Sequence, residues 1–74
     1  LANNLPDYYM ILEIEKDANQ DEIKSQYRRL AKRWHPDKDK SHNAENKMTQ
    51  INMAYEVLSD QKRRKMYDQY FSKT

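Results

Sequence analysis

The residues best placed to act on a partner are His35, Pro36 and Asp37, which follow one another directly. A proline disfavours the helical conformation in the residue before it, so a helix that leads up to the tripeptide should end near Trp34. A second amphipathic stretch follows over residues 43–58. The tripeptide should therefore occupy the exposed tip of a two-helix hairpin, where it presents an imidazole and a carboxylate.

Neither histidine has the companions that catalysis or metal binding requires. The chain contains no cysteine and no glycine, so it has no disulfide, no thiolate metal site and no glycine-rich phosphate loop. His35 and His42 lack further zinc ligands, and neither lies in an arrangement with a nucleophile and an orienting group. We therefore expect no enzymatic activity, no cofactor and no metal, and a function in binding.

Capping residues and hydrophobic periodicity predict an all-α fold without strands. Asp7 is the expected N-cap of a short helix over residues 8–12, and residues 13–18 form a loop. Asn19 is the expected N-cap of a second helix, because Glu22 three residues later completes a capping box. With 74 residues the chain forms one small domain.

The next two helices each carry an apolar stripe with helical spacing. In the second helix the stripe consists of Ile23, Tyr27, Leu30, Ala31 and Trp34. In the third it consists of Ala44, Met48, Ile51, Tyr55 and Leu58. The short connection between these helices predicts that they pack antiparallel. Ser59 is the expected N-cap of a fourth helix, whose apolar face would contain Met66, Tyr67, Tyr70 and Phe71.

Charge is distributed unevenly along a chain whose net charge is only +2. Residues 1–20 contain one lysine and four acids, whereas residues 24–40 contain seven lysines and arginines and two acids. The cations of the second helix lie on both flanks of its apolar stripe: Lys24, Arg28 and Lys32 on one, Arg29 and Arg33 on the other. Such a field attracts an acidic partner, although an ordinary solvated helix face has the same composition.

Six short motifs follow one another in a characteristic order along the chain: residues 7–12 (DYYMIL), 18–23 (ANQDEI), 27–31 (YRRLA), 34–38 (WHPDK), 51–60 (INMAYEVLSD) and 63–68 (RRKMYD). Together they resemble the J-domain of DnaJ-type co-chaperones. The resemblance covers about residues 6–71 and leaves residues 1–5 and 72–74 as flanks. It implies a short first helix, an antiparallel hairpin of two longer helices, and a fourth helix across the base of the hairpin.

The resemblance also implies a function. J-domains bind a DnaK-type chaperone, of the seventy-kilodalton heat-shock class, and stimulate its ATP hydrolysis, which promotes client capture in protein folding. Asp37 would meet a basic residue of the chaperone near its interdomain linker. The residues that match the family's partner-binding surface are His35, Pro36, Asp37, Lys24, Tyr27, Arg28, Arg29, Lys32 and Lys38. The domain itself would not be an enzyme.

Four residues depart from the family pattern. Glu13 stands where a glycine is usual, which affects the end of the first helix. Asp39 stands where asparagine is common and adds negative charge beside the tip. Gln61 replaces a frequent proline, and Met48 replaces a phenylalanine that should lie in the core. None of these changes alters the tripeptide.

Alternative readings of the same residues stay open. The helix over residues 23–34 could lie in a DNA major groove with its cations on phosphates, although Asp21 and Glu22 make its N-terminal end acidic. The domain could also bind a chaperone as a scaffold without stimulating it. Tyr27 could serve the core, the partner, or both.

We expect a monomeric domain within a larger protein, without nucleic-acid or membrane contact. No apolar run approaches the roughly 18 residues of a membrane span. A cytoplasmic or nuclear location is favoured over an organelle lumen.

Overall fold

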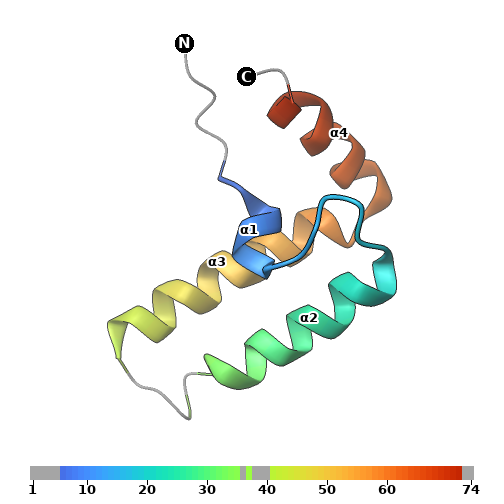
Figure 1. Cartoon of the computed structure of the whole chain (residues 1–74). Coiled ribbons are helices and arrows are strands. Elements are labelled where there is room, and N and C mark those ends of the chain that lie inside the picture. Colours follow the sequence, from blue (N-terminus) through green and yellow to red (C-terminus); the bar gives the residue numbers. More distant parts are fainter. Residues whose placement is uncertain (1–5, 36, 38–40, 73–74) are drawn as a thin grey trace.

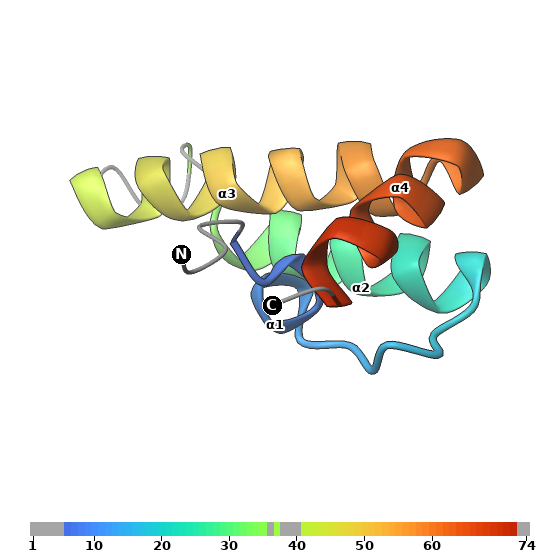
Figure 2. The same cartoon turned by 90° about the horizontal axis from the view of Figure 1, so that it is seen from above.

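The computed structural model describes residues 6–35, 37 and 41–72. These residues form four helices: α1 (Tyr8–Leu12), α2 (Gln20–Arg33), α3 (His42–Leu58) and α4 (Gln61–Ser72). Helices α2 and α3 run antiparallel, and α1 packs against both (Figure 1). Helix α4 follows α3 and returns towards α1, as Figure 2 shows from above. The predicted all-α hairpin fold is confirmed.

The capping residues predicted for the first two helices are confirmed. The side chain of Asp7 accepts a hydrogen bond from the backbone N–H of Met10 at 3.1 Å. Asn19 and Glu22 form the capping box, in which each side chain accepts from the other's backbone N–H, at 2.8 and 3.2 Å. Helix α2 ends at Arg33, directly before its C-cap Trp34, as the proline of the tripeptide predicts.

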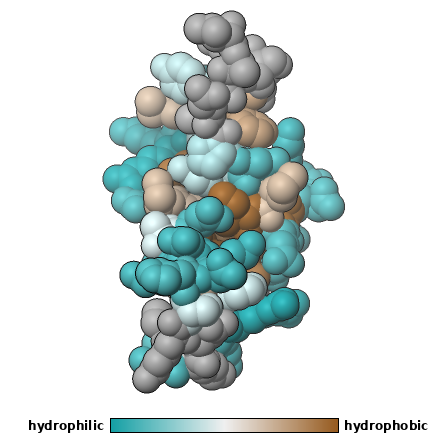
Figure 3. All heavy atoms as spheres, turned by 90° about the vertical axis from the view of Figure 1, so that its left-hand side faces the viewer, coloured by the Kyte–Doolittle hydropathy of each residue, from teal (hydrophilic) through white to brown (hydrophobic). Residues whose placement is uncertain are grey.

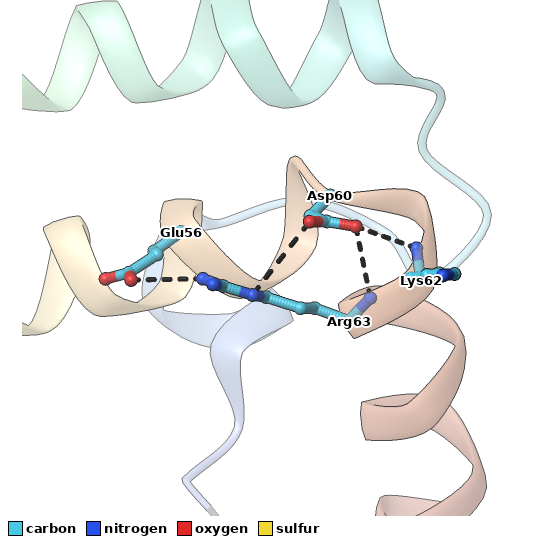
Figure 4. Close-up of polar contacts among 4 residues, drawn as sticks. All are labelled: Glu56, Asp60, Lys62 and Arg63. Carbon is cyan, nitrogen blue, oxygen red and sulfur yellow. Dashed lines mark hydrogen bonds and ion pairs between the residues drawn. The ribbon is translucent and has the colours of Figure 1, made fainter.

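The predicted N-cap of the fourth helix was wrong by one residue. Ser59 is the C-cap of α3, because its N–H donates to the carbonyl of Tyr55 at 2.8 Å. Asp60 caps α4 instead: its Oδ1 accepts from the backbone N–H groups of Lys62 and Arg63 at 2.9 and 3.3 Å (Figure 4). Helix α3 ends at Leu58 and uses Ser59 as its C-cap, so Asp60 is the residue that caps α4.

The two stripes of the hairpin face each other in the core. Their most buried members are Ile23, Leu30, Ala44, Ile51 and Leu58, while Tyr27, Ala31, Trp34, Met48 and Tyr55 are half-buried. Ala54 is also fully buried. It was not among the predicted core residues, because an alanine side chain adds little to the hydrophobic periodicity of a helix. Met48, the substitute for phenylalanine, packs against the core as predicted.

The apolar face predicted for α4 is only half correct. Tyr67 is buried and Phe71 packs against the core, whereas Met66 and Tyr70 are 57% and 59% exposed. A helix presents residues three and four apart on one face. Helix α4 uses Arg64, Tyr67, Asp68 and Phe71 in this way, which turns Met66 and Tyr70 outwards.

One side of the molecule is mainly hydrophilic. The side of the molecule that lies at the left of Figure 1 shows a small hydrophobic area near its middle, surrounded by hydrophilic residues (Figure 3). No helix within the described ranges has the length and apolar character needed to cross a membrane.

The backbone conformation at Glu13 explains why the family favours glycine at this position. It is the C-cap of α1 and has φ 57° and ψ 47°, a left-handed conformation. No other non-glycine residue in the described part of the chain has a positive φ. The left-handed conformation brings Cβ close to the backbone and costs a side-chain-bearing residue roughly 1–2 kcal/mol.

Replacing Glu13 by glycine should therefore stabilise the domain. We expect Glu13→Gly to raise the free energy of unfolding by about 0.5–1 kcal/mol, since glycine gives back part of the gain as unfolded-state entropy. Urea unfolding measures the change. Glu15→Gly, at an exposed loop position without positive φ, is the matched control and should destabilise slightly. Equal effects of the two substitutions would contradict this account.

An aromatic cluster attaches α4 to α1. The ring of Tyr67 stacks on Tyr8 at a centroid distance of 4.9 Å and on Phe71 at 5.2 Å. Its hydroxyl donates to the carbonyl of Pro6 and accepts from the N–H of Tyr8. The cluster thus joins residues about sixty positions apart in the sequence.

Two tyrosines of this region have raised pKa values. Burial is the main cause for both, and a hydrogen bond to the Asp68 carboxylate further raises the pKa of Tyr9. The folded state therefore holds these protons above the ordinary pKa of 10.0. Their contribution to stability is complete below pH 10.0 and is lost as the pH rises through the folded-state pKa.

We expect a measurable effect of this linkage at alkaline pH. The free energy of unfolding, followed by urea denaturation from pH 9 to pH 11, should fall for the wild type. Tyr9→Phe should be less stable at neutral pH but should show a shallower decline. Because lysines titrate in the same range, the difference between the two profiles is the relevant quantity. Parallel profiles would show that Tyr9 does not contribute.

Candidate partner-binding surface

Helix α2 presents an unneutralised cationic face. Because Ile23 and Leu30 fix one side of the helix in the core, Lys24, Arg28, Arg29 and Lys32 are left exposed. We call these four residues the cationic face of α2. Among the described residues, the side chains of these four form no hydrogen bond and no ion pair. Their charge is therefore available to a partner.

The structure brings most of the predicted residues around one open hollow of about 510 Å³ on α2. Its lining consists of Tyr27, Arg28, Arg29, Ala31, Lys32 and His35. Ala31 and the ring of Tyr27 supply apolar surface, and the long cationic side chains supply aliphatic stems below their charges. The hollow therefore suits a partner segment that combines apolar and acidic groups.

The tip places an exposed carboxylate at the end of this face. The side chain of Asp37 is 89% exposed and that of His35 is 52% exposed. The backbone N–H of Asp37 donates to Nδ1 of His35 at 3.2 Å. His35 thus acts as a turn-forming side chain, while the Asp37 carboxylate, 3.6 Å from Nδ1, faces solvent.

The remaining predicted residues are placed differently. Lys24 is exposed on α2 but does not line the hollow. Pro36 and Lys38, like Asp39, lie outside the described residues. His42 is the first residue of α3 and is exposed. Within the described ranges no group of three or more potential metal ligands occurs.

Trp34 packs against the core at the end of α2 that leads to the tip. It is half-buried against the core, and the cations of Arg33 and Lys47 lie 5.4 and 5.9 Å from the centre of its ring. Arg33 therefore points to Trp34, away from the flank that holds Arg28 and Lys32. If the second helix bound DNA, Arg33 would be one of the cations on its phosphates. In the structure Arg33 instead lies over the ring of Trp34.

Two residues that support the site were missed in the sequence. Asn52 accepts a hydrogen bond from the Tyr27 hydroxyl at 2.8 Å, and Tyr55 stacks on the Tyr27 ring with centroids 4.0 Å apart. The predicted antiparallel hairpin could have indicated this pairing, because it places the middle of α2 beside the last turns of α3. Tyr55 was predicted only as a core residue.

The helical hairpin, its short companion helices and the tripeptide at the tip define a J-domain. The family model described as the DnaJ domain matches residues 7–68, and the chain belongs to this family. It is 58% identical over 64 residues to DnaJ homolog subfamily B member 5 of Mus musculus. This match covers 86% of this chain and 18% of that protein. Chaperone protein DnaJ of Mycoplasmoides gallisepticum is 52% identical, with 86% of this chain and 16% of that protein covered.

A solved structure supports the fold independently. The crystal structure of the J-Trx1 fragment of ERdj5 superimposes with a TM-score of 0.83 at 40% sequence identity. The match covers 93% of this chain and 34% of the fragment. The chain thus spans less than a fifth of the curated relatives described above.

Proposed function

We propose that this domain binds a DnaK-type chaperone in its ATP-bound state and stimulates its ATP hydrolysis. The supporting observation is the continuous surface that runs from the cationic face of α2, through the apolar hollow, to the exposed carboxylate of Asp37. Membership of the DnaJ family and the names of the relatives agree with a co-chaperone role.

The two parts of this surface should contribute to different steps. The cationic face of α2 acts at long range and raises the association rate with an acidic chaperone surface, an effect that salt weakens. Asp37 acts at short range, through a directional charge-assisted hydrogen bond to a basic residue of the chaperone. The domain supplies no catalytic group, so it can accelerate hydrolysis only by favouring the chaperone conformation that hydrolyses ATP faster.

Single-turnover hydrolysis tests the proposal directly. A DnaK-type chaperone is loaded with ATP, and the rate of the chemical step is measured at increasing concentrations of the domain. We expect a saturable increase in rate, with a half-saturating concentration that rises with ionic strength. Several chaperones should be compared. No increase with any of them would overturn the proposed function.

A further inference from the structure

Tyr27 lies beside the cationic face of α2 but is held by α3. Its ring stacks on that of Tyr55 with centroids 4.0 Å apart and 14° between the ring planes. Its hydroxyl donates to Oδ1 of Asn52 at 2.8 Å. Among the described residues this is the only hydrogen bond that joins a side chain of α2 to a side chain of α3.

The other contacts between α2 and α3 act elsewhere along the helix or without direction. At the first residue of α2, Nε2 of Gln20 donates to the carbonyl of Leu58 at 3.1 Å. Ile23 and Leu30 are buried in the core and set which side of α2 faces inwards, but apolar contact is non-directional and leaves small rotations of the helix about its axis open. A hydrogen bond and a ring stack depend on angle as well as distance. Tyr27 therefore fixes the rotation of the middle of α2 within the limits that the buried stripe sets.

The rotation of α2 matters because the hollow is built on it. Arg28 follows Tyr27 directly, and Lys32 lies one further turn along the same flank. Tyr27 precedes His35 by two turns, about 12 Å along the helix axis. A contact that fixes Tyr27 thus fixes the directions of the cations relative to the tip.

We propose that Asn52 and Tyr55 are positioning residues for the partner-binding surface of α2. They hold Tyr27, and through it Arg28 and Lys32, in the orientation that the chaperone binds, and they do not touch the chaperone. The inference rests on the proposed function and deepens it. The Tyr27 hydroxyl acts through Asn52, and only the ring of Tyr27 faces the partner.

A double-mutant cycle separates positioning from direct contact. Tyr27→Phe removes only the hydroxyl, Asn52→Ala removes its acceptor, and the third variant carries both changes. Each single substitution should weaken chaperone binding by about three- to tenfold, the range that one net hydrogen bond allows. The double variant should bind no more weakly than either single variant, because all three lose the same interaction.

Conservative variants test the geometry. Asn52→Asp keeps an acceptor for the hydroxyl, so at high ionic strength, where its added charge is screened, it should bind like the wild type. Tyr55→Phe keeps the ring stack and should also bind normally, whereas Tyr55→Leu should weaken binding. Thr49→Ala is the matched control, because Thr49 is exposed on α3 and donates only to the Glu45 carbonyl of its own helix. It should have no effect.

Two results would overturn the inference while leaving the proposed function intact. One is a loss of binding in Tyr27→Phe with none in Asn52→Ala, which would place the hydroxyl on the chaperone. The other is an additive loss in the double variant. Thermal unfolding of every variant confirms that binding is compared among folded domains. A wild-type domain that stimulates no chaperone would instead refute the proposed function, and the inference with it.

Discussion

Replacing Asp37 by asparagine should abolish stimulation of the chaperone. The substitution preserves size and removes one negative charge from a side chain that is 89% exposed, so the fold should be unaffected. Loss of one partner of an interfacial hydrogen-bonded charge pair costs about 2–5 kcal/mol, which corresponds to a loss of roughly 30-fold or more in the stimulated rate at subsaturating concentration. Single-turnover ATP hydrolysis measures the loss.

Arg28→Gln provides the comparison that assigns a role to Asp37. Arg28 belongs to the cationic face, so its neutralisation should mainly slow association, and the difference from wild type should shrink as salt is added. Asp37→Asn should mainly lower the rate at saturation. Stopped-flow association with the ATP-bound chaperone distinguishes the two effects. If Asp37→Asn slowed association as much as Arg28→Gln does, the proposed division between encounter and coupling would be wrong.

Replacing Arg64 by methionine should strongly destabilise the domain. Nε of Arg64 donates to the Tyr9 hydroxyl at 3.1 Å, and Nη2 donates to the carbonyls of Lys16 and Ala18 at 3.1 and 2.7 Å. One guanidinium thus joins α4 to α1 and to the loop before α2. Methionine retains the aliphatic stem but leaves these acceptors without their donor, at a cost of about 2–3 kcal/mol.

Arg63→Met is the matched control for this prediction. Arg63 bridges Glu56 and Asp60 across the junction of α3 and α4 (Figure 4), with Glu56 Oε1 at 3.0 Å and Asp60 Oδ2 at 3.9 Å. All three side chains are at least half exposed, so the loss should stay below about 1 kcal/mol. Thermal unfolding should therefore show a drop of roughly 10–20 °C for Arg64→Met and only a few degrees for Arg63→Met. Equal drops would contradict the assigned role of Arg64.

Local sequence signals identified the helices and the tip. Caps act within three or four residues, so Asp7 and the pair of Asn19 and Glu22 could be recognised directly. The proline after His35 marked the end of α2 for the same reason. The Ser59 prediction failed because two adjacent residues could each cap a helix, and in the structure Ser59 ends α3 while Asp60 caps α4.

The sequence by itself determined the all-α class, the hairpin, the exposed tip and the cationic character of α2, since these follow from local capping and from helical periodicity. Only the tertiary structure decided which side chains of α4 face inwards and which three segments Arg64 joins. It also showed the left-handed conformation that makes the position of Glu13 suit glycine. It also decided that Tyr27 is held by Asn52 and Tyr55. These features depend on contacts between residues distant in the chain, whose partners and distances are set when the helices pack.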